Sequence, residues 1–226
     1  MATILVVDDD AALQRAIGLN LRARGHDVLA ATTGRGALAA FQASRPDLVI
    51  LDLGLPDLDG TVVLRRLRVH AETPVIVLSA RHDAAEKVAA LDDGADDYVT
   101  KPFSMDELVA RVRRALSRTA AQTAPPAPLR GADGLVIDFA GHLAARGGAP
   151  IHLTPIEWRL LAELARHEGG VVPHAELLRA VWGQGYETES HYLRVFVSQL
   201  RRKLEADPAA PVHLVNEAGL GYRLVT

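Results

Sequence analysis

The chain has 226 residues, enough for two modest domains, and its 49% hydrophobic and 23% charged residues are typical of a folded globular protein. No apolar run reaches the length of about 18 residues that a membrane span needs, and the start of the chain lacks the basic segment of a secretory signal, so we expect a cytoplasmic protein with no membrane partner. Cysteine is absent, which excludes disulfides and thiolate metal sites, and a net charge of −3 gives no support to nucleic-acid binding, so any DNA contact must come from a local patch.

The first half of the chain alternates short apolar strands with amphipathic stretches at helical spacing. Five strands are predicted, near residues 4–7, 28–31, 48–51, 75–78 and 97–99. This alternation predicts an α/β domain, a doubly wound five-stranded parallel sheet with helices on both faces. We assign this domain to residues 1–120, and a semi-rigid linker with several prolines to residues 121–129.

Polar side chains follow four of the predicted strands. In chain order they are Asp8 and Asp9, then Asp52, then Ser79, then Lys101. Ligands bind at the carboxyl edge of an open parallel sheet, so these groups should converge there. Each of the aspartates and the serine alone is more often a turn former or a helix cap, but the complete set in this order favours a reactive site.

Carboxylates held within a few ångströms repel one another, and Mg²⁺ suits them because it prefers oxygen ligands and keeps waters that a phosphate can replace. We expect Asp9, Asp52 and the Gly54 carbonyl to ligate Mg²⁺, with Asp8 acting mainly through metal-bound water. Asp52 would attack phosphorus and form an acyl phosphate, while Lys101 helps to balance the charge of the phosphoryl oxygens.

Two neighbours of this pocket have predicted structural roles. Asp10 is expected to cap the helix that follows it. A cis peptide bond is expected before Pro102, in a tight turn that would aim Lys101 inward.

The pattern changes after the linker. Short strands with turn glycines, at 135–138 and 151–153, predict a small antiparallel sheet. Helices are predicted from Thr154, where Glu157 completes a capping box, at 174–182 and at about 190–206. A closing hairpin around a Gly-x-Gly turn completes the pattern of an α+β winged helix-turn-helix domain, which we assign to residues 130–226.

The predicted helix at 190–206 has an apolar stripe of Leu193, Val197, Leu200 and Leu204. The opposite side and its flanks carry the residues expected to contact DNA: His191, Arg194, Val195, Ser198, Gln199, Arg201, Arg202 and Lys203. In a major groove, arginine and lysine can bind phosphates or guanine, glutamine can pair with adenine, and valine can touch a thymine methyl. The alternative is a solvated basic helix packed on a core.

Five segments together resemble the receiver domain of two-component response regulators. They are Val7-Asp8-Asp9, Leu51–Asp57, Leu78–Arg81, Gly94–Tyr98 and Lys101-Pro102-Phe103. The second half resembles the winged-helix effector of the OmpR/PhoB class, so the resemblance covers nearly the whole chain. It implies that a sensor histidine kinase phosphorylates Asp52, and that Ser79, where the family more often has threonine, and Tyr98 reorient on phosphorylation.

A narrower resemblance involves the Kdp-type regulators of high-affinity potassium uptake. It depends on Leu51–Asp57, His152–Glu157, His191–Arg194 and Asn216–Tyr222. It implies control of a potassium-transport operon, with another regulon in the same class as the alternative.

The resemblance also implies that phosphorylation promotes a two-fold homodimer through a charged helix-strand-helix face. The residues expected on this face are Lys87, Asp96, Asp97, Glu107, Arg111 and Arg118, with Arg114 beside them. Taken alone, these residues are typical of a solvated charged face, where an exposed ion pair contributes only ~0–1 kcal/mol.

The terminal hairpin departs from the family pattern. The wing commonly carries an arginine just before its first glycine, and here Ala218 precedes Gly219, so minor-groove contact is weak or falls to Arg223. The loop at 183–190 corresponds to a segment that contacts RNA polymerase in the family.

Two other functions fit part of the chain. Phosphatases and related hydrolases also use a strand-end aspartate, but they usually place a second aspartate two residues on, where this chain has Gly54. We therefore expect no enzyme beyond slow self-dephosphorylation. The second alternative, a receiver used only for protein-protein signalling, leaves the basic helix unexplained.

Overall fold

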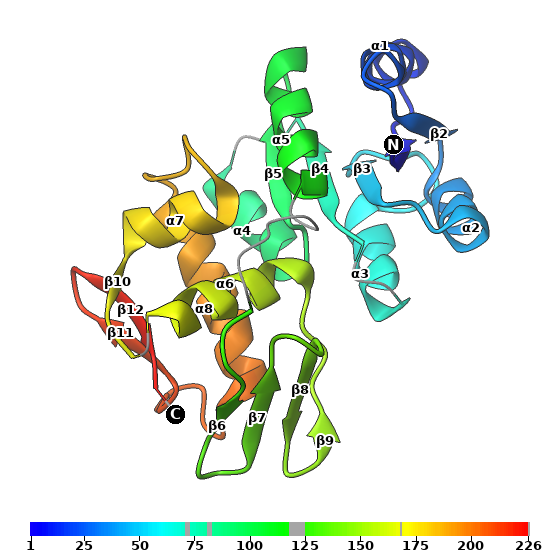
Figure 1. Ribbon diagram of the computed structural model, residues 1–226. Helices are drawn as coiled ribbons and strands as arrows, with labels where there is room; N and C mark the ends of the chain where they lie inside the picture. The colour runs from blue at the N-terminus through cyan, green and yellow to red at the C-terminus, as the bar shows by residue number, and fades with distance from the viewer. Residues whose placement is uncertain (71–72, 81–82, 118–124, 168, 226) are drawn as a thin grey trace. The chain divides into compact units, whose positions relative to one another are not determined.

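The structure is a computed structural model that describes residues 1–70, 73–80, 83–117, 125–167 and 169–225. The chain forms two compact units, Met1–Ala121 and Gln122–Thr226 (Figure 1). The predicted linker at 121–129 begins outside the described residues; residues 125–128 contain neither helix nor strand, and its last residue, Leu129, begins a short strand. Every helix in the described ranges is too short or too polar to span a bilayer.

Strands and helices alternate along the described part of the first unit (Figure 1). In chain order they are β1 (Thr3–Val7), α1 (Ala11–Arg22), β2 (Asp27–Ala31), α2 (Gly34–Ser44), β3 (Leu48–Asp52), α3 (Gly60–His70), β4 (Val75–Ser79), α4 (Ala84–Asp92), β5 (Asp97–Thr100) and α5 (Met105–Ser117). The strands agree with the predicted ranges to within a residue or so at each end.

The strands pair in parallel in the order β2-β1-β3-β4-β5, which confirms the predicted five-stranded parallel sheet. Ile4, Ile50 and Leu78 pack in one buried cluster with Ile17 of α1 and Leu108 of α5. The strand order reverses between β1 and β3, so the connections that leave these two strands diverge. In open α/β sheets, ligands bind at the carboxyl ends of the strands at such a point.

The second unit contains two small antiparallel sheets and three helices in its described residues. They are β6 (Leu129–Arg130), β7 (Leu135–Asp138), β8 (Leu143–Arg146), β9 (Ala149–Pro150), α6 (Pro155–Arg166), β10 (Val172–Pro173), α7 (His174–Trp182), α8 (Ser190–Leu204), β11 (Leu214–Glu217) and β12 (Gly221–Leu224). One sheet has the order β6-β7-β8-β9 and the other β10-β12-β11. This is the predicted winged-helix arrangement.

Two details of the second unit differ from the prediction. The strand expected at 151–153 is instead β9 at Ala149–Pro150, and the terminal hairpin gains a third strand because β10 pairs with β12. Strands of two residues are too short to show a period of two in the sequence. The capping box is confirmed, since Thr154 accepts from the Glu157 N–H and the Glu157 carboxylate accepts from the Thr154 N–H.

Candidate functional site

Three carboxylates gather at the carboxyl ends of β1 and β3. Parallel pairing aligns Val7 with Leu51, which brings Asp8 and Asp9 beside Asp52. One oxygen from each carboxylate lies within 4.8 Å of the others. Asp8 is completely buried and Asp52 is 6% exposed, whereas Asp9 is exposed. Three oxygen donors of this kind fit a hard cation such as Mg²⁺.

Lys101 connects two of these carboxylates. Its Nζ donates to Asp8 Oδ2 at 2.8 Å and to Asp52 Oδ2 at 2.9 Å. Its backbone N–H donates to the Ser79 carbonyl at 2.7 Å, which holds the end of β5 beside the end of β4. The Lys101–Pro102 peptide bond is cis, as predicted. The structure therefore brings together the residues that the sequence placed at four strand ends.

The pocket has more negative than positive charge. Burial raises the pKa of Asp8 above its ordinary value, against the hydrogen bond from Lys101, which lowers it. Burial by itself lowers the pKa of Lys101, but its hydrogen bonds to Asp8 and Asp52 outweigh that effect and leave this pKa raised. One ammonium faces three carboxylates, so a divalent cation would relieve the remaining repulsion.

Asp10 has the structural role that the sequence predicts. Its carboxylate accepts from the Leu13 N–H at 3.1 Å and the Ala12 N–H at 2.8 Å, and these bonds lower the pKa of Asp10. It is the N-cap of α1. The Asp10 carboxylate therefore stabilises the N-terminus of α1 and is not a ligand of the acidic pocket.

The loop after β3 is held in place by Asp57. Its carboxylate accepts from the Arg35 N–H at 3.1 Å and the Gly34 N–H at 2.6 Å, so it binds the N-terminus of α2. Earlier in this loop the Gly54 N–H donates to Asp52 Oδ1 at 3.3 Å. A metal-ligating role for the Gly54 carbonyl stays a prediction.

Ser79 and Tyr98, the two residues expected to reorient, are both 2% exposed. Ser79 ends β4, and the strand register places Leu78 opposite Asp52 and Thr100 opposite Ser79. The Ser79 hydroxyl therefore belongs to the same edge of the sheet as the acidic pocket. Switching by these two residues stays a prediction.

Asp96, one of the residues predicted on the dimer face, has its partners within the receiver. It is 1% exposed, its Oδ2 accepts from the Val75 N–H at 2.8 Å, and it forms an ion pair with Arg68 of α3. A carboxylate with these partners ties the start of β5 to the start of β4 and to α3. It is an interior structural group, because the residue before β5 points into the domain.

The other charged residues of the predicted dimer face are partly paired within the chain. Arg111 Nη1 donates to both oxygens of Asp97, at 2.8 and 3.0 Å, and Arg111 Nη2 donates to Glu107 at 2.8 Å. Lys87 is half-buried on α4, and Arg118 lies outside the described residues. The contribution of these residues to a dimer stays a prediction.

The residues expected to face DNA on α8 differ in exposure. Arg194, Ser198 and Arg202 are exposed, and His191 is half-buried. Val195 and Gln199 are only 6% and 8% exposed. The contribution of these two residues to DNA binding stays a prediction.

Two cations predicted to contact DNA have partners inside the second unit. Arg201 donates from Nε and Nη2 to the Leu214 carbonyl, at 3.0 and 2.7 Å. Lys203 Nζ donates to Glu157 Oε2 at 2.6 Å, and Glu157 is completely buried. Whether either residue contacts DNA stays a prediction. They lie on the flanks of α8, where neighbouring elements reach them.

The terminal hairpin carries the remaining predicted DNA residue. Arg223 of β12 forms an ion pair with Glu217 of β11 at 3.0 Å, and its side chain is 41% exposed. Ala218 and Gly219 form the turn, where Gly219 has a φ of +76° that favours glycine. An exposed surface pair of this kind is weak, so Arg223 can exchange Glu217 for a phosphate.

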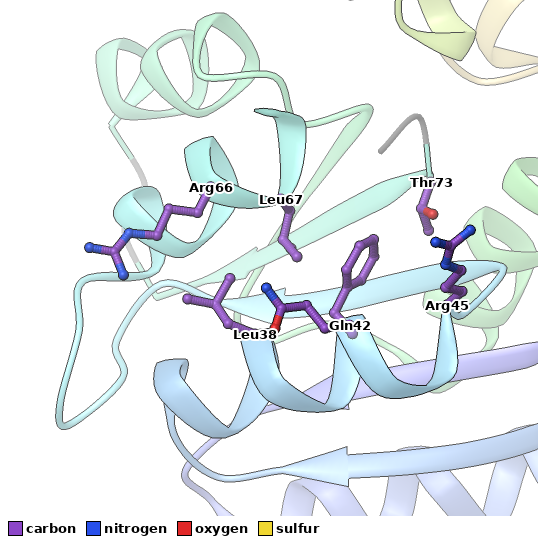
Figure 2. A pocket seen from close by; sticks show the side chains of 7 residues that line it. Leu38, Gln42, Arg45, Arg66, Leu67 and Thr73 are labelled. Atoms are coloured by element: carbon purple, nitrogen blue, oxygen red, sulfur yellow. The ribbon is translucent and has the colours of Figure 1, made fainter. Parts of the chain in front are cut away.

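A groove of about 450 Å³ lies between α2 and α3, away from these residues (Figure 2). Figure 2 shows Leu38 and Leu67 facing one another across it, with Arg45 near Thr73 at one end and Arg66 at the other. The groove includes none of the predicted site residues. The groove is therefore separate from the acidic cluster at the sheet edge.

Known families match both units. Residues 4–113 match the response regulator receiver domain, and residues 148–224 match the C-terminal domain of transcriptional regulatory proteins. The chain is thus a two-component response regulator of the OmpR/PhoB type, with a receiver that accepts a phosphoryl group and a DNA-binding effector domain. Such proteins regulate transcription rather than act as classical enzymes, and they work with a histidine kinase and promoter DNA.

Full-length relatives agree with this class. The chain is 53% identical to the transcriptional regulatory protein KdpE of Mycobacterium tuberculosis, over 99% of each chain. It is 46% identical to the KDP operon transcriptional regulatory protein KdpE of Escherichia coli, over 100% of each chain. Among solved structures, a mutant of RitR has a TM-score of 0.81 at 25% identity, and the match covers 100% of this chain and 99% of the RitR chain.

Proposed function

We propose that Asp52 is the phosphoacceptor of this regulator and that the carboxylates around it form a Mg²⁺ site. The observation that supports this proposal is the triad of Asp8, Asp9 and Asp52 within 4.8 Å, bridged by Lys101. A carboxylate oxygen of Asp52 forms a bond to phosphorus as the bond from phosphorus to the donor nitrogen of a phosphohistidine breaks. Lys101 then exchanges one carboxylate for a phosphoryl oxygen and stabilises its charge.

Asp9, Asp52 and the Gly54 carbonyl would hold the cation, with Asp8 acting through its water shell. When bound, Mg²⁺ supplies positive charge that offsets the phosphoryl oxygens. Hydrolysis of the acyl phosphate is limited to slow self-dephosphorylation, because Gly54 stands where related hydrolases have an acid/base carboxylate.

The output of this proposal is DNA binding by a dimer. Phosphorylation at Asp52 shifts Ser79 and Tyr98 and raises the population of a two-fold receiver dimer through α4, β5 and α5. Asp97, Glu107 and Arg111 form an acid-base set on those elements. Such pairs suit a symmetric interface when they exchange partners between two chains.

The regulated genes are inferred from the relatives. Identity of 53% and 46% to two KdpE proteins over the whole chain supports control of a potassium-transport operon. We place the protein in the cytoplasm, because the promoter DNA that it binds is there. The loop at 183–190 between α7 and α8 is the proposed contact for RNA polymerase.

A gel shift with the upstream DNA of a potassium-transport operon tests the proposal. Acetyl phosphate with Mg²⁺ is expected to increase the affinity of the wild type and to leave the affinity of Asp52→Ala unchanged. An increase of equal size in both proteins would rule out Asp52 as the acceptor, whereas DNA binding that ignores phosphorylation in both would remove the switch and leave the DNA-binding role.

A further inference from the structure

The last turn of α8 carries an acid and a base one helical turn apart, Arg201 and Glu205. Glu205 is the C-cap residue of α8 and is 6% exposed, and Arg201 is half-buried. Both side chains reach the segment that enters β11, the first strand of the hairpin. We call the hairpin of β11 and β12 the wing.

The two side chains bind the same stretch of backbone through its two kinds of polar group. The Glu205 carboxylate accepts from the N–H groups of Val212 at 3.1 Å, His213 at 3.0 Å and Leu214 at 2.8 Å. Arg201 donates two N–H bonds to the Leu214 carbonyl, at 3.0 and 2.7 Å. All five bonds involve a charged group, and such bonds are stronger than neutral ones.

This contact extends to the second strand of the wing. Leu214 lies opposite Leu224 in the antiparallel pair. The ring of His213 is buried with its Nδ1 at 2.9 Å from the Val225 carbonyl, and the Val225 N–H donates to the His213 carbonyl at 2.8 Å. The base of the wing is therefore attached as a whole to the end of the helix.

A phosphate contact would compete with this arrangement. Arg201 has its Nε and Nη2 on the Leu214 carbonyl, so turning toward DNA would take both donors from a completely buried residue. An oxygen that loses its partner in a buried place costs about 1–3 kcal/mol, which opposes that movement. The exposed neighbour Arg202 has the same charge and a solvent-facing side chain.

We propose that Arg201 and Glu205 are positioning residues for DNA recognition: they set the position of the wing relative to α8, so that helix and wing reach adjacent grooves as one unit, and neither residue contacts DNA. The inference goes further than the proposed function; it rests on the DNA binding proposed there and on the sequence-based expectation that minor-groove contact falls to Arg223 of the wing.

The test compares Arg201→Met with Arg202→Met in the full-length chain. Both variants remove one positive charge from neighbouring positions of α8. Each is phosphorylated with acetyl phosphate and Mg²⁺ and bound to an operator that the wild type selects from random duplexes. Two properties are measured: the dependence of affinity on salt concentration, and hydroxyl-radical protection of the DNA backbone at the groove bound by α8 and at the groove bound by the wing.

The two variants should behave differently. Arg202→Met is expected to lower the slope of log affinity against log salt by about 0.9, the value for one lost phosphate contact, and to keep both protected grooves. Arg201→Met is expected to keep the protection by α8 and to lose protection by the wing, with a slope that falls only because the Arg223 contact is lost. Glu205→Gln, on the other side of the same contact, should also lose protection by the wing alone.

Three results would overturn the inference. A salt slope that falls in Arg201→Met while the groove bound by the wing stays protected means a direct phosphate contact by Arg201. Loss of both protected grooves together means that Arg201 only stabilises the domain, and a wild type that protects one groove shows that the wing does not bind. If Arg201→Met does not fold by circular dichroism, Arg201→Lys, which keeps the charge and loses the paired donors, is measured in the same way.

Discussion

Two places in this molecule hold a lysine against carboxylates, and they differ in the charge that remains. In the receiver, Lys101 bonds Asp8 and Asp52 with Asp9 close by, so three acids face one ammonium. In the effector unit, Lys203 bonds Glu157 one to one. The balanced pair leaves no charge for a ligand and fastens α8 to α6.

The comparison separates structural charges from functional ones. Excess carboxylate at a sheet edge attracts a cation and then a phosphoryl group. A balanced buried pair has no net charge to attract a ligand, and its role is to hold two elements together. Arg68 with Asp96 is a second balanced pair, inside the receiver. The two kinds of site should therefore respond in opposite ways to removal of a charge.

The largest effect is expected from Asp52→Asn, which should abolish phosphorylation by acetyl phosphate. Its free energy of unfolding should change little or rise, because the substitution removes one of three mutually repelling charges. Phosphate-affinity electrophoresis and urea unfolding measure the two properties. Asp10→Asn, which alters only the cap of α1, is the control and should remain phosphorylated. A phosphorylated Asp52→Asn protein would contradict the assignment.

Asp96→Asn should have the opposite effects on these two properties: stability should fall and phosphorylation should persist. The receiver should lose about 3 kcal/mol of its free energy of unfolding, because the guanidinium of Arg68 is left buried without its partner. The phosphoacceptor should still react. Arg68 is 11% exposed, while Arg65, which pairs with Asp93 at 2.7 Å, is 64% exposed.

The exposed pair of Arg65 and Asp93 supplies the control. Asp93→Asn should cost only about 0–1 kcal/mol in the same urea unfolding experiment, because its ion pair is at the surface. Equal losses in Asp93→Asn and Asp96→Asn would show that burial does not distinguish the two pairs.

A smaller loss is expected from Lys203→Met in the effector unit. Glu157 would keep its bond from the Thr154 N–H but lose its cation, and we expect a loss of about 2 kcal/mol, typical of a hydrogen bond to a charged group. Urea unfolding measures this loss. The salt dependence of DNA affinity should match that of the wild type, and a lower slope would restore Lys203 as a phosphate contact.

The smallest effect concerns pH and a third charged cluster. The hydrogen bond from His213 holds the pKa of Asp133 at about 2, below its ordinary 3.8. Because the folded-state pKa is lowered, the contribution of this carboxylate to stability is present above about pH 4 and is lost as the pH falls toward about 2. The difference in urea midpoint between wild type and Asp133→Asn should shrink over that range, and a constant difference would show that the bond does not depend on ionisation.

Much of the receiver pocket follows from the order of residues along the chain. Parallel strands separated by helices place their carboxyl ends at one edge, so Asp8, Asp52, Ser79 and Lys101 had to converge once the strands were recognised. Asp10 and the capping box of Thr154 and Glu157 are equally local, since their partners lie within three residues. Local patterns of this kind survive folding because few other contacts compete with them.

The tertiary structure decided which charges remain available. Helical spacing placed Arg201 and Lys203 near the DNA-facing side of α8, but their partners come from β11 and from α6, and Asp96 is paired with an arginine 28 residues away. No periodicity in the sequence records such a partner, because an ion pair between elements depends on how they pack. The sequence by itself determined the acidic sheet edge and the amphipathic helix α8, whereas packing determined that Arg201, Lys203 and Asp96 each join elements within their own unit.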